Sequence, residues 1–188
     1  MSKNIQILDC TLRDGGLGLE DAEKNDLSHV RFSENDSRMT AGYLADSAID
    51  IIELGSIEIT SDDRTGFCIY KNIEDISKQM PLKKKQNQMF AALYRGPDTP
   101  IDDIPKWNPS LCEAVRVIIR YSELQKSLDF CAALSSKGYK VFVQPMLTMR
   151  YTKEEIQLLI EKSNEMNAYA LYFVDSYGYM ENRDVVDL

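Results

Sequence analysis

Short apolar segments alternate with longer amphipathic segments six times along this chain, and this alternation limits the fold more than any other feature. The apolar segments, rich in β-branched and aromatic residues, predict strands at 5–8, 50–55, 88–94, 114–120, 139–146 and 169–174. Between them, 123–137 has an apolar helical face that ends at Gly138, and Thr152 with Glu155 forms a capping pattern. Nearly continuous apolar strands linked by helices are typical of a parallel sheet covered by helices.

Polar residues follow the predicted strands at their carboxyl ends. Two architectures are standard for a parallel sheet covered by helices: a (β/α)8 barrel and an open doubly wound sheet. In a barrel the carboxyl ends of the strands converge on one rim and form one pocket. No G-x-G-x-x-G pattern follows any strand, which weakens a dinucleotide-binding open sheet. We therefore expect an α/β fold, a (β/α)8 TIM-type barrel of which this chain carries about six βα units. The rim residues would be Arg13, Asp14, Glu53, Tyr94, Arg95, Arg120, Gln144, Asp175 and Ser176.

Composition excludes several classes of function. Acidic residues outnumber basic ones by 30 to 22, and a net charge of −8 argues against non-specific nucleic-acid binding. No apolar run approaches the roughly 20 residues that span a bilayer, and residues 1–4 leave no room for a secretory signal. The four scattered cysteines form no CxxC pair, as expected of reduced thiols. We expect a cytoplasmic protein that binds neither membranes nor nucleic acid.

The stretch from Thr11 to Gly16 (Thr-Leu-Arg-Asp-Gly-Gly) has the composition of a turn, because glycine adopts backbone angles denied to other residues. Residues 17–34 are polar and lack a sustained period, so we expect a functional loop or lid there. Asp14 is a candidate metal ligand and Arg13 a candidate anion clamp. His29 is the sole histidine, so this chain alone cannot supply a site built from several histidines.

Three motifs in order resemble one family, the metal-dependent pyruvate-type aldolases and acyl-CoA lyases. Residues 8–16 (Leu-Asp-Cys-Thr-Leu-Arg-Asp-Gly-Gly) resemble its first-strand signature, and 52–56 (Ile-Glu-Leu-Gly-Ser) match at the second strand. Residues 174–180 (Val-Asp-Ser-Tyr-Gly-Tyr-Met) are similar to the Asp-Ser-x-Gly-x-Met pattern of the aldolase branch. Within the family, the chain most resembles the 4-hydroxy-2-oxovalerate aldolases.

The resemblance implies a carbon–carbon lyase that cleaves a 4-hydroxy-2-oxo acid to pyruvate and an aldehyde through a metal-stabilised enolate. The implied cofactor is a divalent ion, Mn²⁺ before Mg²⁺ or Zn²⁺. Asp14 matches the first metal ligand, and Arg13 matches the catalytic arginine that steadies the enolate oxygen and binds substrate. Glu53 and Ser176 match positions near the substrate. An aldehyde dehydrogenase partner is implied by the aldolase branch, and an open sheet edge favours a homo-oligomer.

The sequence also departs from the family. The remaining metal ligands of the family form a His-x-His pair on a seventh strand, which this chain does not contain, and residues 16–18 (Gly-Leu-Gly) replace the usual proton-shuttle histidine. Residues 1–188 are then a single barrel domain without the last two βα units, either as a piece of a longer enzyme or as a natural relative that has lost its metal site. The first predicts an enzyme active in its full-length form, and the second a non-catalytic barrel that binds a small ligand or a protein. A weaker alternative is an open sheet that binds a nucleotide at Gly15–Gly18.

Overall fold

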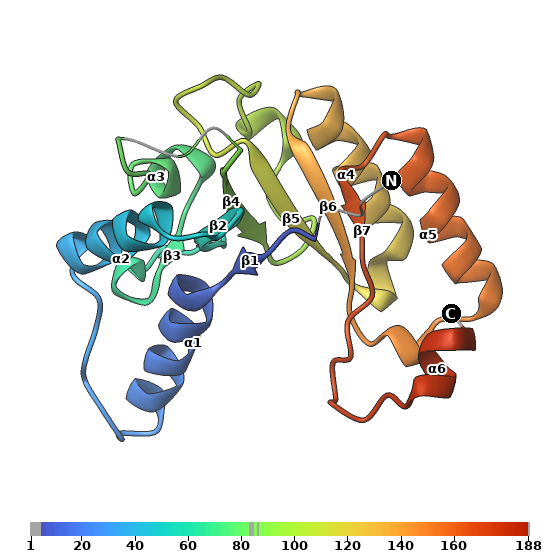
Figure 1. The fold of residues 1–188 in the computed structure, drawn as a ribbon, viewed down its shortest axis with the longest axis horizontal. Coiled ribbons are helices and arrows are strands. Elements are labelled where there is room, and N and C mark those ends of the chain that lie inside the picture. Colours follow the sequence, from blue (N-terminus) through green and yellow to red (C-terminus); the bar gives the residue numbers. More distant parts are fainter. Residues whose placement is uncertain (1–4, 83–84, 86, 188) are drawn as a thin grey trace.

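A computed structural model describes residues 5–82, 85 and 87–187 (Figure 1), so Met1–Asn4 and most of the lysine run at 83–85 lie outside the described residues. The strands are β1 (Leu8–Asp9), β2 (Ile51–Ile57), β3 (Ile69–Tyr70), β4 (Met89–Tyr94), β5 (Ala114–Ile119), β6 (Lys140–Pro145) and β7 (Ala170–Leu171). The helices are α1 (Thr11–Lys24), α2 (Glu34–Asp46), α3 (Ile73–Ser77), α4 (Leu124–Ser136), α5 (Lys153–Glu165) and α6 (Asn182–Asp187).

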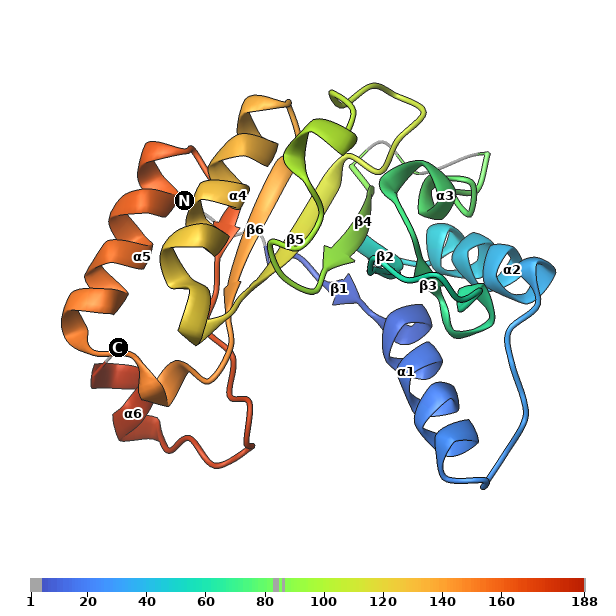
Figure 2. The ribbon, with the colours of Figure 1, turned by 180° about the vertical axis from the view of Figure 1, so that it is seen from behind.

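All strands belong to one parallel sheet with the order β1-β2-β4-β5-β6-β7, and the short β3 pairs with β2 beside this path. The sheet curls into an arc, and helices α2, α3, α4 and α5 cover its outer side (Figures 1 and 2). Consecutive parallel strands with outer helices form a partial (β/α)8 barrel, so the predicted fold class is confirmed. None of the helices in the described part of the chain is long and apolar enough to cross a membrane.

Alternate residues of each strand face two different layers. The outward residues pack against the helices in a large core that includes Ile52, Val117, Val143, Leu128, Leu134 and Leu159. The inward residues at the amino-terminal ends of the strands form a smaller cluster of Ile51, Met89, Ala91, Ala114 and Phe142. Because strand side chains alternate with a period of two, the outer layer is apolar throughout. The inner layer is apolar at its base and becomes polar toward the carboxyl ends of the strands.

The segment after the first strand differs from the prediction. Residues Thr11–Lys24 form the helix α1, so the expected turn at Thr11–Gly16 and the first part of the expected loop, 17–24, are wrong, whereas 25–33 form the connection between α1 and α2. A Cβ atom on the buried Gly16 would lie 1.9 Å from the carbonyl oxygen of Phe67. Gly16 is therefore required where α1 packs closely against the short turn Thr65–Phe67, and not where the chain reverses. The nucleotide-binding alternative for Gly15–Gly18 is also wrong, because these residues lie inside a helix rather than in a turn, and the sheet curls into a partial barrel instead of the open doubly wound form.

Candidate functional site

Glu53 lies between two arginines inside the barrel. Its side chain on β2 is fully buried, and its Oε1 atom accepts a hydrogen bond from Nε of Arg13 in the first turn of α1. The other oxygen, Oε2, accepts a hydrogen bond from Nη1 of Arg116 on β5 at 2.5 Å. Burial raises the pKa of the Glu53 carboxyl, whereas Arg116 and Arg13 act in the opposite direction. The two guanidinium groups thus supply the opposite charge and the hydrogen bonds that a buried carboxylate requires.

Arg116 extends this network to the far edge of the sheet. Its Nε donates to the Tyr172 hydroxyl at 2.6 Å, and its Nη2 donates to Oε1 of Gln144 at 2.9 Å. The Tyr172 hydroxyl donates in turn to the same Gln144 oxygen at 2.6 Å. Burial raises the pKa of Tyr172 to about 12, so this hydroxyl keeps its proton at neutral pH. Side chains from α1, β2, β5, β6 and the end of β7 therefore form one connected polar layer.

Asp14 lies at the edge of this layer. Its carboxylate pairs with Nη1 of Arg13 at 2.7 Å and is more than half exposed, and the thiol of Cys10 donates to it at 3.1 Å. Burial and the neighbouring Asp14 raise the pKa of the Cys10 thiol. All four cysteines of the chain are free thiols, as predicted.

The donor set around Asp14 does not fit a catalytic divalent ion. Across residues 5–82, 85 and 87–187, no three His, Cys, Asp or Glu side chains gather in a group that could hold a metal. His29 is exposed and pairs with Asp26 at 3.4 Å. Catalytic metal sites usually take three protein ligands. Asp14 could supply one of these ligands and is already paired with a guanidinium.

A cavity of about 550 Å³ opens above the polar layer, at the carboxyl ends of the strands. Arg13 and Gln144 belong to both the layer and the cavity wall. The wall also contains Arg95 after β4 and Arg120 after β5, so four of the predicted rim residues lie around one space. The remaining lining is Leu17, Ile57, Glu58, Ile59, Gly96, Asp98, Thr99, Ile118 and Met146.

The predicted site residues are only partly brought together. Arg13, Asp14 and Glu53 are in direct contact with one another through Arg13. Ser176 lies outside the lining of this cavity, and its hydroxyl accepts a hydrogen bond from the Leu147 backbone N–H at 2.8 Å. In this structure Ser176 thus joins the segment after β6 to the segment after β7.

Two members of the polar layer, Arg116 and Tyr172, are absent from the sequence-based prediction. Arg116 carries a detectable signal, because it is a lone charge inside the apolar run Ala114–Ile119 and shares the inward parity of Ala114. A charge at such a position requires buried partners. Tyr172 carries no comparable signal, since tyrosine is common in strands.

Comparison with known proteins shows what shares this architecture. No protein-family model matches the chain, and no curated protein matches it. Two solved structures superpose on 97% of it. One is the N-terminal domain of a "putative aldolase" from Bacteroides vulgatus, with a TM-score of 0.73 and 20% identity. The other is the carboxyl transferase domain of Rhizobium etli pyruvate carboxylase with oxamate and biotin, with a TM-score of 0.62 and 14% identity.

The chain shares its fold with these two barrel domains. At these identities the likeness concerns the fold alone. The chain spans 58% of the first of these proteins and 32% of the second.

Proposed function

We propose that this chain belongs to a carbon–carbon lyase that cleaves a 4-hydroxy-2-oxo acid to pyruvate and an aldehyde. The observation that supports the proposal is the placement of Arg13, which is fixed by the buried Glu53 and lines the cavity at the carboxyl ends of the strands. This is the end of a parallel barrel at which active sites are found.

Cleavage between C3 and C4 leaves the bonding electrons on the pyruvate fragment as an enolate, and the proton of the 4-hydroxyl passes to solvent as the aldehyde forms. The enolate then takes a proton from solvent at C3 to give pyruvate, so no net proton is gained or lost. Arg13 remains charged at any physiological pH, and its Nη atoms can donate to the developing enolate oxygen. Glu53 restrains the guanidinium from the opposite side through Nε. Arg13 is therefore the proposed catalytic and substrate-binding residue and Glu53 orients it, while the substrate-binding roles of Glu53 and Ser176 remain predictions.

The divalent ion stays a separate proposal. Asp14 would be one ligand of Mn²⁺, Mg²⁺ or Zn²⁺, and the other ligands would have to come from outside the described residues, which contain no suitable group.

The test follows the partial reaction as well as turnover. The protein is mixed with a 4-hydroxy-2-oxo acid, with and without Mn²⁺, and pyruvate is measured by coupled NADH oxidation. In parallel, pyruvate alone is incubated in D₂O, and loss of the methyl proton signal reports enolate formation. We expect exchange that Arg13→Gln reduces by about 10²-fold or more, the scale on which one oxyanion-stabilising donor acts. An absence of exchange and turnover under all conditions would overturn the proposal.

A second candidate is a barrel that binds a 2-oxo acid or a protein partner without catalysis. The observation in its favour is the absence, among the described residues, of a three-ligand metal group. Binding of pyruvate in a titration, without exchange of its methyl protons, is the result that would support this candidate.

The remaining expectations are proposals as well. We propose that residues 1–188 act as one barrel domain in the cytoplasm, without nucleic-acid partners. The strands β1 and β7 at the two edges of the sheet are each paired on one side and could receive a second copy or an aldehyde dehydrogenase. Size-exclusion chromatography with light scattering measures the first association.

A further inference from the structure

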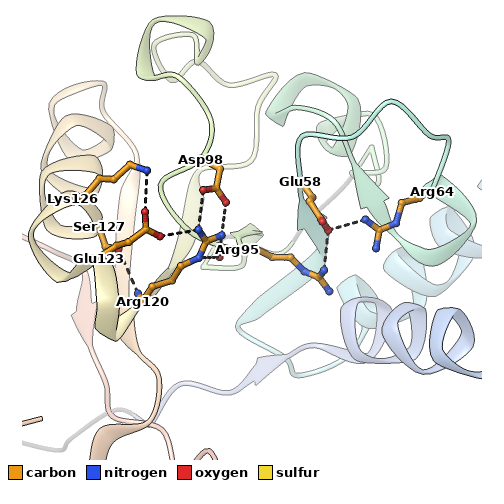
Figure 3. A network of polar contacts seen from close by, with 8 residues as sticks. All are labelled: Glu58, Arg64, Arg95, Asp98, Arg120, Glu123, Lys126 and Ser127. Carbon is orange, nitrogen blue, oxygen red and sulfur yellow. Dashed lines mark hydrogen bonds and ion pairs between the residues drawn. The ribbon is translucent and has the colours of Figure 1, made fainter. Parts of the chain in front are cut away.

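Arg95 and Arg120 both line the cavity, but their guanidinium groups are bonded very differently (Figure 3). Nε and Nη2 of Arg120 donate to the backbone carbonyl of Arg95 at 3.2 and 3.0 Å. Nη1 donates to Asp98 at 2.8 Å and to Glu123 at 2.9 Å, and Nη2 donates to the second oxygen of Asp98. A guanidinium has five N–H donors, so Arg120 has none left for a ligand.

Arg120 instead fixes the backbone that carries Arg95. Its guanidinium lies against Gly96, where a Cβ atom would come within 2.5 Å of it. Gly96 also has a φ of +147°, which side-chain-bearing residues rarely adopt. The chain from Arg95 to Asp98 is thus held in one conformation at the mouth of the cavity.

Arg95 itself keeps most of its donors. Its Nη1 donates to Oε2 of Glu58 at 2.8 Å, and in the described part of the chain this is the single partner of its guanidinium. Four of its five N–H groups are therefore open to a ligand. Arg13 keeps far fewer, because Nε is bonded to Glu53 and both Nη atoms contact Asp14.

The charge around Arg95 is also unbalanced. Glu58 Oε2 is shared between Arg95 and Arg64, which pairs with it at 2.9 Å. Arg64 also pairs with Glu20, and Glu20 pairs with Lys24 at 3.0 Å. This ion-pair chain contains three cations and two anions, and it ends at the cavity on Arg95. By contrast, the group of Arg120, Asp98, Glu123 and Lys126 contains equal numbers of each.

We propose that Arg95 binds a second carboxylate of the substrate, so that the site takes 2-oxo diacids in preference to 2-oxo monoacids. This inference rests on the proposed function, in which Arg13 receives the 2-oxo acid end. A guanidinium with free donors binds a carboxylate through two parallel hydrogen bonds. One surplus positive charge matches one carboxylate, and a dianionic phosphate would need more. The retained anionic group would leave on the aldehyde fragment.

The test compares two acids of equal chain length by isothermal titration. These are 2-oxoglutarate, with a carboxylate at each end, and 2-oxopentanoate, in which a methyl group replaces the second carboxylate. We expect the wild-type protein to bind 2-oxoglutarate at least about tenfold more tightly, as one charge-assisted contact provides. This comparison needs no variant and therefore does not depend on the folding of one.

Variants then assign the preference to Arg95. We expect Arg95→Gln to weaken 2-oxoglutarate binding about tenfold and to change 2-oxopentanoate binding by less than about twofold. Arg95→Lys should restore part of the loss. Glu58→Gln removes the competing carboxylate and should tighten binding of the diacid. Arg38→Gln, on the exposed surface of α2 and paired with Glu34, is the matched control and should change neither affinity.

The outcomes separate this inference from the proposed function. Equal affinity for the two acids, or an Arg95→Gln variant that weakens both to the same extent, overturns the diacid preference while leaving the lyase proposal standing. A diacid preference without any exchange of pyruvate protons or turnover overturns the lyase and supports the binding role of Arg95. Failure of both acids to bind overturns the diacid preference, and the exchange and turnover measurements then decide the lyase proposal.

Discussion

At the scale of the residue, the inside of the barrel depends on one carboxylate shared by two cations. Glu53 is fully buried and Arg116 is only 6% exposed, so neither can replace its partner with water. The same arrangement that fixes Arg13 for chemistry therefore makes the polar layer sensitive to the loss of a single member. Removing one partner from a buried ion pair leaves an uncompensated charge.

Arg116→Met tests this dependence. We expect a loss of about 3–5 kcal/mol in the free energy of unfolding, because Glu53 loses one cation while Tyr172 and Gln144 lose a donor. Urea unfolding followed by circular dichroism measures it. Arg38→Met, on an arginine whose side chain is about half exposed, should stay within about 0.5 kcal/mol of wild type. A similarly small effect for Arg116→Met would show that Glu53 does not depend on it.

At the scale of the element, α1 carries the proposed catalytic arginine, and its orientation is set by contact with the turn Thr65–Phe67. The helix contains three glycines, which weaken its intrinsic propensity, so packing must supply its stability. Gly16 allows the close approach, while a Cβ on Gly18 would meet no atom within 4 Å. Gly16 is therefore required for close packing, whereas the position of Gly18 has room for a larger side chain.

The two glycines therefore predict opposite effects of the same substitution. Gly16→Ala should destabilise the protein by about 1–3 kcal/mol through overpacking against the Phe67 carbonyl. Gly18→Ala should stabilise it by about 0.5–1 kcal/mol, because alanine is the better helix former and space is free. Paired thermal and urea unfolding curves check both. Equal signs for the two variants would contradict the packing role of Gly16.

This helix also shows where prediction from the sequence ends. The glycines at 15, 16 and 18 indicate a turn if only local propensity is considered, and the contact with Phe67 that reverses the conclusion lies some fifty residues away. The helix α4 is close to its predicted bounds, and α5 begins after the predicted cap Thr152, because an apolar face and the capping pair Thr152 and Glu155 are local signals. The two-residue strand β3 has no local signal and was not predicted.

At the scale of the whole molecule, the alternation of strands and helices was sufficient to predict the curled parallel sheet. Rim residues such as Arg95 and Gln144 could be assigned to one cavity because parallel strands place their carboxyl ends together. The partners of each charge could not be assigned in this way. Individual hydrogen bonds decide that the Arg120 guanidinium holds the backbone in place while the Arg95 guanidinium keeps free N–H donors. These bonds follow from the positions of Asp98 and Glu58.

The arrangement of the sheet predicts how its amides exchange with solvent. The strands β2, β4, β5 and β6 are paired on both sides, whereas β1 and β7 are two-residue edge strands. We expect hydrogen exchange to be slowest in the four inner strands and fastest in β1 and β7. Mass spectrometry of peptic fragments measures this. Edge strands as protected as β5 would show that another chain covers them, which would support the proposed oligomer.

The contact between Cys10 and Asp14 has a practical consequence. Of the four thiols, three are buried in the core, and Cys10 is partly accessible beside the carboxylate and guanidinium of the site. A thiol-specific chromophore or fluorine label, applied at alkaline pH because the pKa of this thiol is raised, would attach next to Asp14 without any engineered cysteine. We expect its signal to respond when a ligand occupies the cavity that the adjacent Arg13 lines.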